Sequence, residues 1–139
     1  MGHIKPSKPL ILDSRLVKPE RIHVPVSVSF RHAVCGGDFC LSSSTPDEVR
    51  GVIDCLRQLT TMTWYDVLRS GGKGGGKAGL GYEAYSDSAL KRASRPDFLS
   101  KELKISGIRA SQKYRVFGFY HDHIFHILWF DRNHDIVPV

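Results

Sequence analysis

The chain has 139 residues, of which 41% are hydrophobic, and a formal net charge of +6 at pH 7. The length fits a single domain and the apolar share is enough for one compact core, which excludes wholesale disorder. The positive charge favours polyanionic partners, namely RNA, DNA or an acidic protein. The three cysteines come without a signal-sequence pattern or an apolar run of membrane-spanning length. We therefore expect reduced thiols, a cytoplasmic location and no membrane contact.

The first part of the chain predicts an extended arm followed by one strand. Residues 1–20 contain three prolines and no clear periodicity, so we expect an N-terminal arm ahead of a single domain over residues 21–139. Apolar side chains occupy alternate positions over residues 24–30, which is typical of a half-buried strand. Pro25 cannot donate a hydrogen bond to a neighbouring strand, so this strand is expected at a sheet edge or begins irregularly.

Two helices are predicted next. Residues 45–48, Thr-Pro-Asp-Glu, combine a capping box with a proline at the first helical position. Apolar side chains then recur at helical spacing and predict one core-facing stripe: Val49, Val52, Ile53, Leu56 and Leu59. Thr63, with an acidic residue three positions later, predicts the start of a second, short helix through Leu68.

A glycine-rich loop is predicted over residues 70–81. It nearly matches the G-x-x-x-x-G-K phosphate-binding motif, but the final Ser or Thr is missing and the loop follows a helix instead of a strand. Two alternatives to nucleotide binding remain: a solvated linker, or a basic loop whose Lys73 and Lys77 contact RNA phosphates. Residues 82–103 predict only isolated helical turns.

The C-terminal part predicts a β-hairpin. Residues 114–120 and 124–130 are β-prone runs that a short loop over residues 121–123 separates. The second run is apolar at nearly every position, so we expect a central strand covered on both faces. Residues 131–134 predict a turn and residues 135–137 a last short strand. The chain therefore predicts an α+β domain with two or three helices packed on a small, mainly antiparallel sheet that ends in a β-meander.

The number of histidines and cysteines suggests a metal site, but their spacing in the sequence does not fit one. Four of the seven histidines fall within fourteen residues, but their spacing matches no standard zinc pattern: His121, His123, His126 and His134. We interpret His126 as a core residue and the first two as residues flanking a turn. Cys35 and Cys40, with His32 nearby, supply only three ligands, and we interpret the cysteines as small loop residues. We expect no metal and no cofactor.

A basic and aromatic stretch over residues 91–115 favours RNA. It holds eight cations against two acidic residues, and aromatic residues follow directly. Cations contact phosphates and aromatic rings stack on bases, whereas the alternative is a solvated face beside core aromatics. The candidate RNA-binding residues are Lys73, Lys77, Lys91, Arg92, Arg95 and Lys104.

If the protein is an enzyme, these residue types suit RNA cleavage through the 2′-hydroxyl. That reaction needs a base, an acid and positive charge around the phosphorane, but no metal and no protein nucleophile. His134 can supply an acid or base near neutral pH. The candidates for positive charge are Arg109, Lys113 and Arg115. Tyr120 and His121 are two further candidates for the catalytic site.

The end of the chain also carries a resemblance. Residues 114–119 and 125–134 resemble the ending R-V-x-G-F … F-x-x-W-x-D-x-x-H of a group of small bacterial and phage proteins, and residues 59–63 look like theirs too. The layout of helices followed by a β-meander is similar to the RelE/ParE-like toxins of type II toxin–antitoxin modules. The glycine-rich loop and the long arm are additions to that layout.

That resemblance implies a cytosolic mRNA-cleaving toxin that acts without metal, often on the ribosome, and is neutralised by a cognate antitoxin. By position in the meander it implies roles for Arg109, Lys113, Arg115 and His134. The alternative that stays open is a non-catalytic RNA- or protein-binding module of phage or defence origin.

Overall fold

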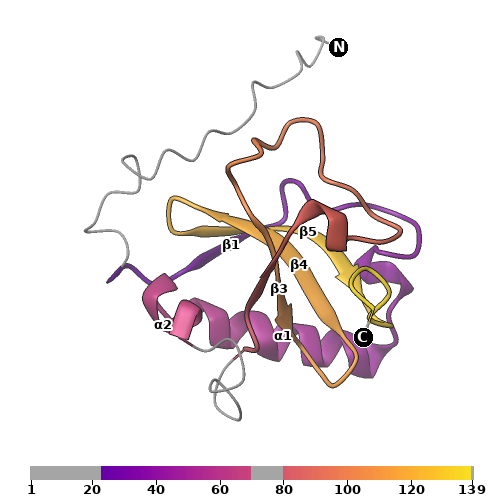
Figure 1. Ribbon diagram of the computed structural model, residues 1–139. Helices are drawn as coiled ribbons and strands as arrows, with labels where there is room; N and C mark the ends of the chain where they lie inside the picture. Colours follow the sequence, from indigo (N-terminus) through magenta and orange to yellow (C-terminus); the bar gives the residue numbers. More distant parts are fainter. Residues whose placement is uncertain (1–22, 70–79, 139) are drawn as a thin grey trace, which may run out of the picture.

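The computed structural model of the chain describes residues 23–69 and 80–138 (Figure 1). The predicted N-terminal arm lies outside this part, as do residues 70–79 of the predicted glycine-rich loop, with Lys73 and Lys77. The regular elements in chain order are β1 (Ser27–Ser29), η2 (Leu41–Ser43), α1 (Pro46–Thr60), α2 (Trp64–Arg69), β2 (Glu83–Tyr85), η3 (Asp87–Ala89), β3 (Ile105–Arg109), β4 (Arg115–His121) and β5 (Ile124–Asp131).

The described strands form one mixed sheet in the order β1-β5-β4-β3-β2. Strands β2 to β5 are an antiparallel meander, and β1 pairs in parallel with β5 at one edge. The α+β class and the C-terminal meander are thus confirmed. The edge position of the first strand is confirmed as well, which agrees with a proline just before it.

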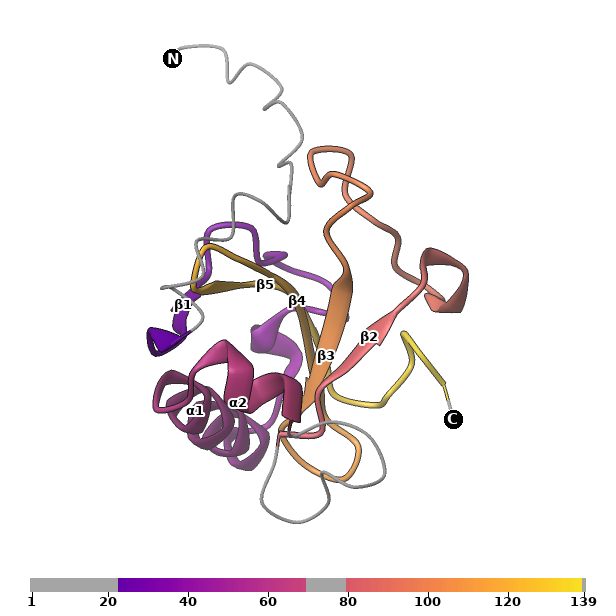
Figure 2. The same cartoon turned by 60° about the vertical axis from the view of Figure 1, so that its left-hand side comes forward.

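Two core clusters lie on the two faces of the sheet. Helices α1 and α2 cover one face (Figure 2), where the first core includes Val52, Leu59, Trp64 and Phe125. The other face is covered by the irregular segment over residues 86–104 and by the end of the chain, whose side chains form the second core with the sheet: Leu90, Leu99, Leu103, Phe117, Phe119, Trp129 and Ile136.

The start of α1 follows the predicted capping pattern. Thr45 accepts a hydrogen bond from the Glu48 N–H, and the Glu48 carboxylate accepts one from the Thr45 N–H. Arg132 donates to the same carboxylate, which ties α1 to the end of β5. The buried stripe of the helix is Val52, Cys55 and Leu59. Ile53 is 50% exposed, so its assignment to the core face was wrong.

The predicted C-terminal hairpin is confirmed. Its two-residue turn, Asp122 and His123, has positive φ at both positions, as a type I′ turn requires. Strand β5 lies between β1 and β4, and it is buried along most of its length. An irregularity in its pairing with β4 leaves one extra residue on β5, so Leu128 and Trp129 both enter the second core.

Three short elements differ from the expectation. Strands β2 and β3 fall in residues for which no strand was predicted. The predicted last strand over residues 135–137 does not form. The Asp131 carboxylate accepts hydrogen bonds from the N–H groups of Asp135 and Ile136, which holds this segment as an irregular continuation of the turn instead of a strand.

Candidate functional site

The predicted catalytic residues lie at two ends of the sheet. Arg109 and Arg115 face each other across β3 and β4, with Lys113 in the turn between them. In the register of β4 and β5, Arg115 lies opposite Asp131. The turn that follows β5 and carries His134 therefore lies at this end of the sheet. Tyr120 and His121 end β4 at the opposite end, beside the β4–β5 turn that appears at the left of Figure 1. The structure therefore does not unite these six residues in one site.

At the first end, Arg115 is engaged with its own hairpin. Its guanidinium donates to the carbonyls of Ser111, Gln112 and Tyr114 at 2.9, 3.1 and 3.2 Å. Burial, and then the positive charge of Arg109, lower the pKa of Arg115. Lys113 is exposed and forms no ion pair with any residue in the described ranges. This end presents positive charge, but Arg115 has a structural task there.

One cation of the predicted RNA-binding stretch uses its charge within the second core layer. Arg95 is largely buried and donates to the Asp87 carboxylate and to the carbonyls of Ser100 and Leu103. Lys91 is held to this layer only through its backbone N–H, which donates to the Ile136 carbonyl, and its side chain is exposed. The positive charge of residues 91–115 is therefore only partly available to a polyanion.

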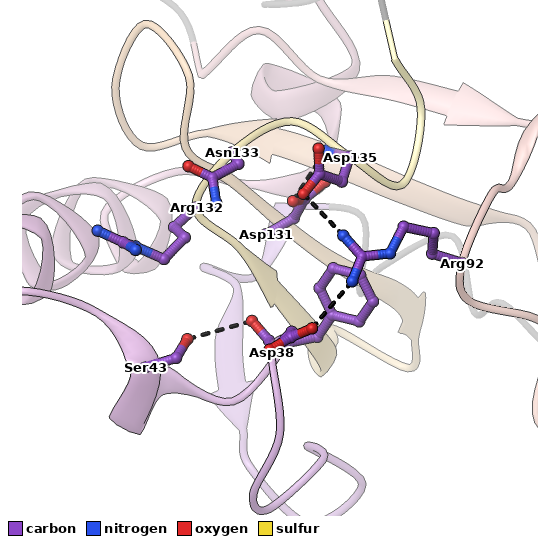
Figure 3. Close-up of a pocket in the computed structure, with 8 residues that line it drawn as sticks. Asp38, Ser43, Arg92, Asp131, Arg132, Asn133 and Asp135 are labelled. Carbon is purple, nitrogen blue, oxygen red and sulfur yellow. Dashed lines mark hydrogen bonds and ion pairs between the residues drawn. The ribbon is translucent and has the colours of Figure 1, made fainter.

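A cavity of about 210 Å³ lies at the end of β5 (Figure 3). Arg92 bridges Asp38 and Asp135 at 2.9 and 3.0 Å, and Arg132 pairs with the Glu48 carboxylate at 2.9 Å. Each guanidinium that lines this cavity thus has a carboxylate partner. The cavity offers a phosphate no unpaired guanidinium, and we assign this network a structural role. Its lining residues are Asp38, Phe39, Ser43, Arg92, Asp131, Arg132, Asn133 and Asp135.

A second cavity, of about 240 Å³, has aromatic walls, and we refer to it as the aromatic cavity. It lies where α2 and the segments before β2 and β3 meet β3 and β4. It contains one predicted catalytic residue and one predicted RNA-binding residue. Its lining residues are Trp64, Tyr82, Glu102, Lys104, Ser106 and Tyr120.

Strand alternation explains how Ser106 of β3 faces this cavity, and Glu102 and Lys104 reach it from the turn and the residues just before the strand. Side chains along an extended chain point alternately to opposite faces. The intervening Leu103 and Ile105 belong to the second core on the other face. Ser106 pairs with Gly118 at the start of the β3–β4 ladder, and Lys104 just before β3 lines the cavity together with Tyr120 of β4.

The aromatic walls are tightly arranged. The rings of Trp64 and Tyr120 are stacked with centroids 4.0 Å apart and an interplanar angle of 5°. Tyr82 meets Trp64 edge-on at 5.2 Å. Burial raises the pKa of Tyr120 and of Tyr82, although a hydrogen bond with Ser106 partly opposes the rise for Tyr82. Both phenols therefore keep their protons at neutral pH and can act as hydrogen-bond donors.

The arrangement combines aromatic walls with three kinds of polar group. The Tyr120 hydroxyl is buried, whereas the Glu102 carboxylate and the Lys104 positive charge are exposed at the solvent side of the cavity. The volume is below the roughly 300–1,000 Å³ of sites for drug-sized ligands, so it suits one planar ring system and not a whole nucleotide. A base inside and a phosphate at the exposed side fit this geometry.

Sequence reasoning missed four residues of this cavity. Trp64 and Tyr82 are far from the basic stretch in sequence, so only the fold brings them to it. Glu102 and Ser106 carried a signal that was overlooked: polar residues alternate with apolar ones over residues 102–106, which is the pattern of a half-buried strand.

No group of three or more His, Cys, Asp or Glu is placed to hold a metal ion within residues 23–69 and 80–138. His126, for example, stacks on Phe119 with ring centroids 4.8 Å apart. Over the same ranges no helix has both the length and the apolar composition needed to cross a membrane. Comparison of the chain with protein-family models, curated proteins and solved structures finds no match.

Proposed function

We propose that this chain is a toxin-like endoribonuclease of a toxin–antitoxin module, an mRNA interferase that cleaves RNA in the cytoplasm at the aromatic cavity. The observation that carries the proposal is that Tyr120 and Lys104 line one cavity together with Glu102. The sequence had suggested Tyr120 for catalysis and, independently, Lys104 for RNA contact. The layout of helices followed by a meander, on which the toxin resemblance rests, also supports the proposal.

In the proposed reaction, an unstacked base enters the aromatic cavity and contacts the Trp64 and Tyr82 walls. The Glu102 carboxylate takes the proton of the 2′-hydroxyl, whose oxygen attacks the adjacent phosphorus. Tyr120 donates its proton to the departing 5′-oxygen, and Lys104 stabilises the charge of the phosphorane. The bond to the 5′-oxygen breaks and a 2′,3′-cyclic phosphate forms, without a metal ion.

The remaining exposed cations extend the path of the RNA backbone. Arg109 and Lys113 lie at the far end of β3 and in the turn after it, so phosphates beyond the cleaved one can reach them along the sheet. The net charge of +6 favours both RNA and an acidic antitoxin as partners.

Removal of a single hydroxyl tests the reaction. Tyr120→Phe keeps the ring that stacks on Trp64 but removes the proton donor, so we expect RNA cleavage in the presence of a chelator to fall by roughly 100-fold or more. Tyr65→Phe is the matched control, because Tyr65 is exposed on α2 and does not line the cavity. Full activity in Tyr120→Phe would remove Tyr120 from the site.

The stacking walls also favour a second function, a non-catalytic RNA-binding module. In that case no cleaved product forms, but binding of a single-stranded oligoribonucleotide weakens steeply with salt. Lys104→Gln then reduces the slope of log K against log salt by about 0.7, the contribution of one phosphate contact in a single strand. Lys101→Gln, which makes the same charge change outside the cavity, leaves the slope unchanged if the contact is specific.

A further inference from the structure

Four rings from four parts of the chain lie against one another on the face of the sheet that carries the second core. His32, in the loop over residues 30–34 that follows β1, stacks on Phe98 of the irregular segment with ring centroids 4.5 Å apart. The His32 ring lies 5.7 Å from the ring of His126 on β5. The His126 ring in turn stacks on Phe119 of β4 at 4.8 Å. Two imidazoles are therefore neighbours between two phenyl rings.

The surroundings of His126 offer no partner for a proton. Its Nδ1 atom is buried and forms no hydrogen bond with the described residues. The charges that act on this ring are all positive, since they come from Arg31 and His32 in the loop and from His121 on β4. The irregular segment contributes the uncharged ring of Phe98 to the cluster. A proton on His126 would therefore be buried next to like charges.

These surroundings keep both imidazoles neutral in the closed loop. Burial, and then the charges of His32, His121 and Arg31, lower the pKa of His126 to about 4. Burial, and then the charge of Arg31, also lower the pKa of His32. The contact between the neutral rings is therefore fully stable above the ordinary histidine pKa of about 6.5, and it weakens as the pH falls toward 4.

The rest of the loop is held by one backbone bond to β5 and by side chains that are not fully buried. The Val34 N–H donates to the Leu128 carbonyl at 2.9 Å. Ala33 is partly buried against the first core, whereas Phe30 and Val34 are 54% and 39% exposed. The loop can thus open without removing a fully buried side chain from either core.

We propose that the His32–His126 pair is a pH-sensitive switch that releases the loop over residues 30–34 from the sheet in acid while the rest of the domain stays folded. Protonation of one imidazole places a positive charge beside the other ring, and both rings gain water when the loop opens. The open loop no longer covers Phe98 and Phe119, so apolar surface of the second core becomes exposed. The switch does not depend on the proposed RNA cleavage at the aromatic cavity.

Hydrogen exchange at the Val34 amide of the full-length protein tests the proposal, because its bond to the Leu128 carbonyl breaks when the loop opens. His126 has a pKa of about 4 in the closed state and regains the ordinary 6.5 in the open one, so it alone favours opening about 20-fold more at pH 5 than at pH 7. Protection of Val34, expressed relative to an unstructured chain at each pH, should fall by that factor.

Low concentrations of urea separate the release of the loop from unfolding of the whole domain. Opening of a short loop exposes little surface, so exchange at Val34 at pH 5 should stay nearly constant as urea is added. Exchange through global unfolding accelerates with urea instead. A Val34 exchange rate that rises in parallel with the slowest amides of β4 would overturn the proposal.

Two histidine variants identify the group that titrates. His126→Gln should lose most of the pH response at Val34, because glutamine does not take up a proton. His23→Gln is the matched control, since His23 is exposed and lies outside the ring cluster, and it should respond like the wild type. Unchanged protection of Val34 between pH 7 and pH 5 in the wild type, or an equal response in His126→Gln, would also overturn the proposal.

Discussion

Tyr120 illustrates how one side chain acquires a chemical role from its neighbours. Its ring rests on Trp64, which fixes its orientation, and burial raises the pKa of its hydroxyl above the ordinary value. In the proposed reaction this phenol, which lines the same cavity as Lys104 and Glu102, donates a proton to the leaving oxygen. The residue type alone accounts for the protonation at neutral pH, but the position of the ring follows from the fold.

His126 makes the stability of the protein depend on pH. Its ring stacks on Phe119, and burial lowers its pKa to about 4, with further contributions from the charges of His32, His121 and Arg31. The unfolded chain binds a proton at this histidine near pH 6.5, before the folded chain does. The stability that neutral His126 provides is therefore present above pH 6.5 and is lost as the pH falls toward 4.

We expect urea unfolding to show this loss directly. Between pH 7 and pH 5 the free energy of unfolding of the wild type should fall more than that of His126→Gln, because glutamine does not titrate. Burial also lowers the pKa of His32, so the variant should keep part of the dependence. His23→Gln, a change at an exposed histidine, should behave like the wild type. Equal pH dependence in wild type and His126→Gln would contradict the burial account.

At the scale of elements, the β4–β5 turn holds two residues with a Cβ in a backbone conformation that glycine adopts at lower cost. Asp122 and His123 have φ values of +51° and +61°, a region that costs a residue with a Cβ more than glycine. His123→Gly should therefore raise the free energy of unfolding by up to about 1 kcal/mol. The backbone carbonyl that accepts from Ser27 is kept in this variant.

A matched glycine substitution checks that this gain comes from the turn conformation. Gln112→Gly lies in the β3–β4 turn at a residue without positive φ, so it should lower stability through the added freedom of the unfolded chain. Thermal unfolding of the two variants beside the wild type gives the comparison. A loss of stability in His123→Gly would show that this side chain contributes more than its backbone strain costs.

The elements also show which structure was predictable from sequence. Local signals predicted α1, α2 and the C-terminal hairpin, because caps and alternation act over a few residues. Strand β3 was missed although polar and apolar residues alternate at its start, because Ser106 and Gly107 have low β propensity and only the alternation pointed to it. The strand expected over residues 135–137 failed because the Asp131 side chain takes its donors.

At the scale of the whole molecule, the fold divides the cations of residues 91–115 into two groups: those that bind other groups of the protein and those that remain available to a ligand. Arg92 and Arg95 pair with carboxylates, and Arg115 holds its hairpin. Lys104 and Lys113 form no ion pair with the described residues and lie at opposite ends of the sheet. Composition predicted that this region binds RNA, which stays a prediction. It could not predict where the site lies, since the partner side chains come from separate elements.

Inducible expression in a bacterial host, with growth and total RNA followed over time, tests the RNA-cleavage proposal most directly. The wild type and Lys101→Gln should both arrest growth and produce cleaved RNA. Lys104→Gln should relieve both effects, because it removes the positive charge that lines the aromatic cavity. Intact RNA and normal growth with the wild type, or equal cleavage by Lys104→Gln, would contradict RNA cleavage at this cavity.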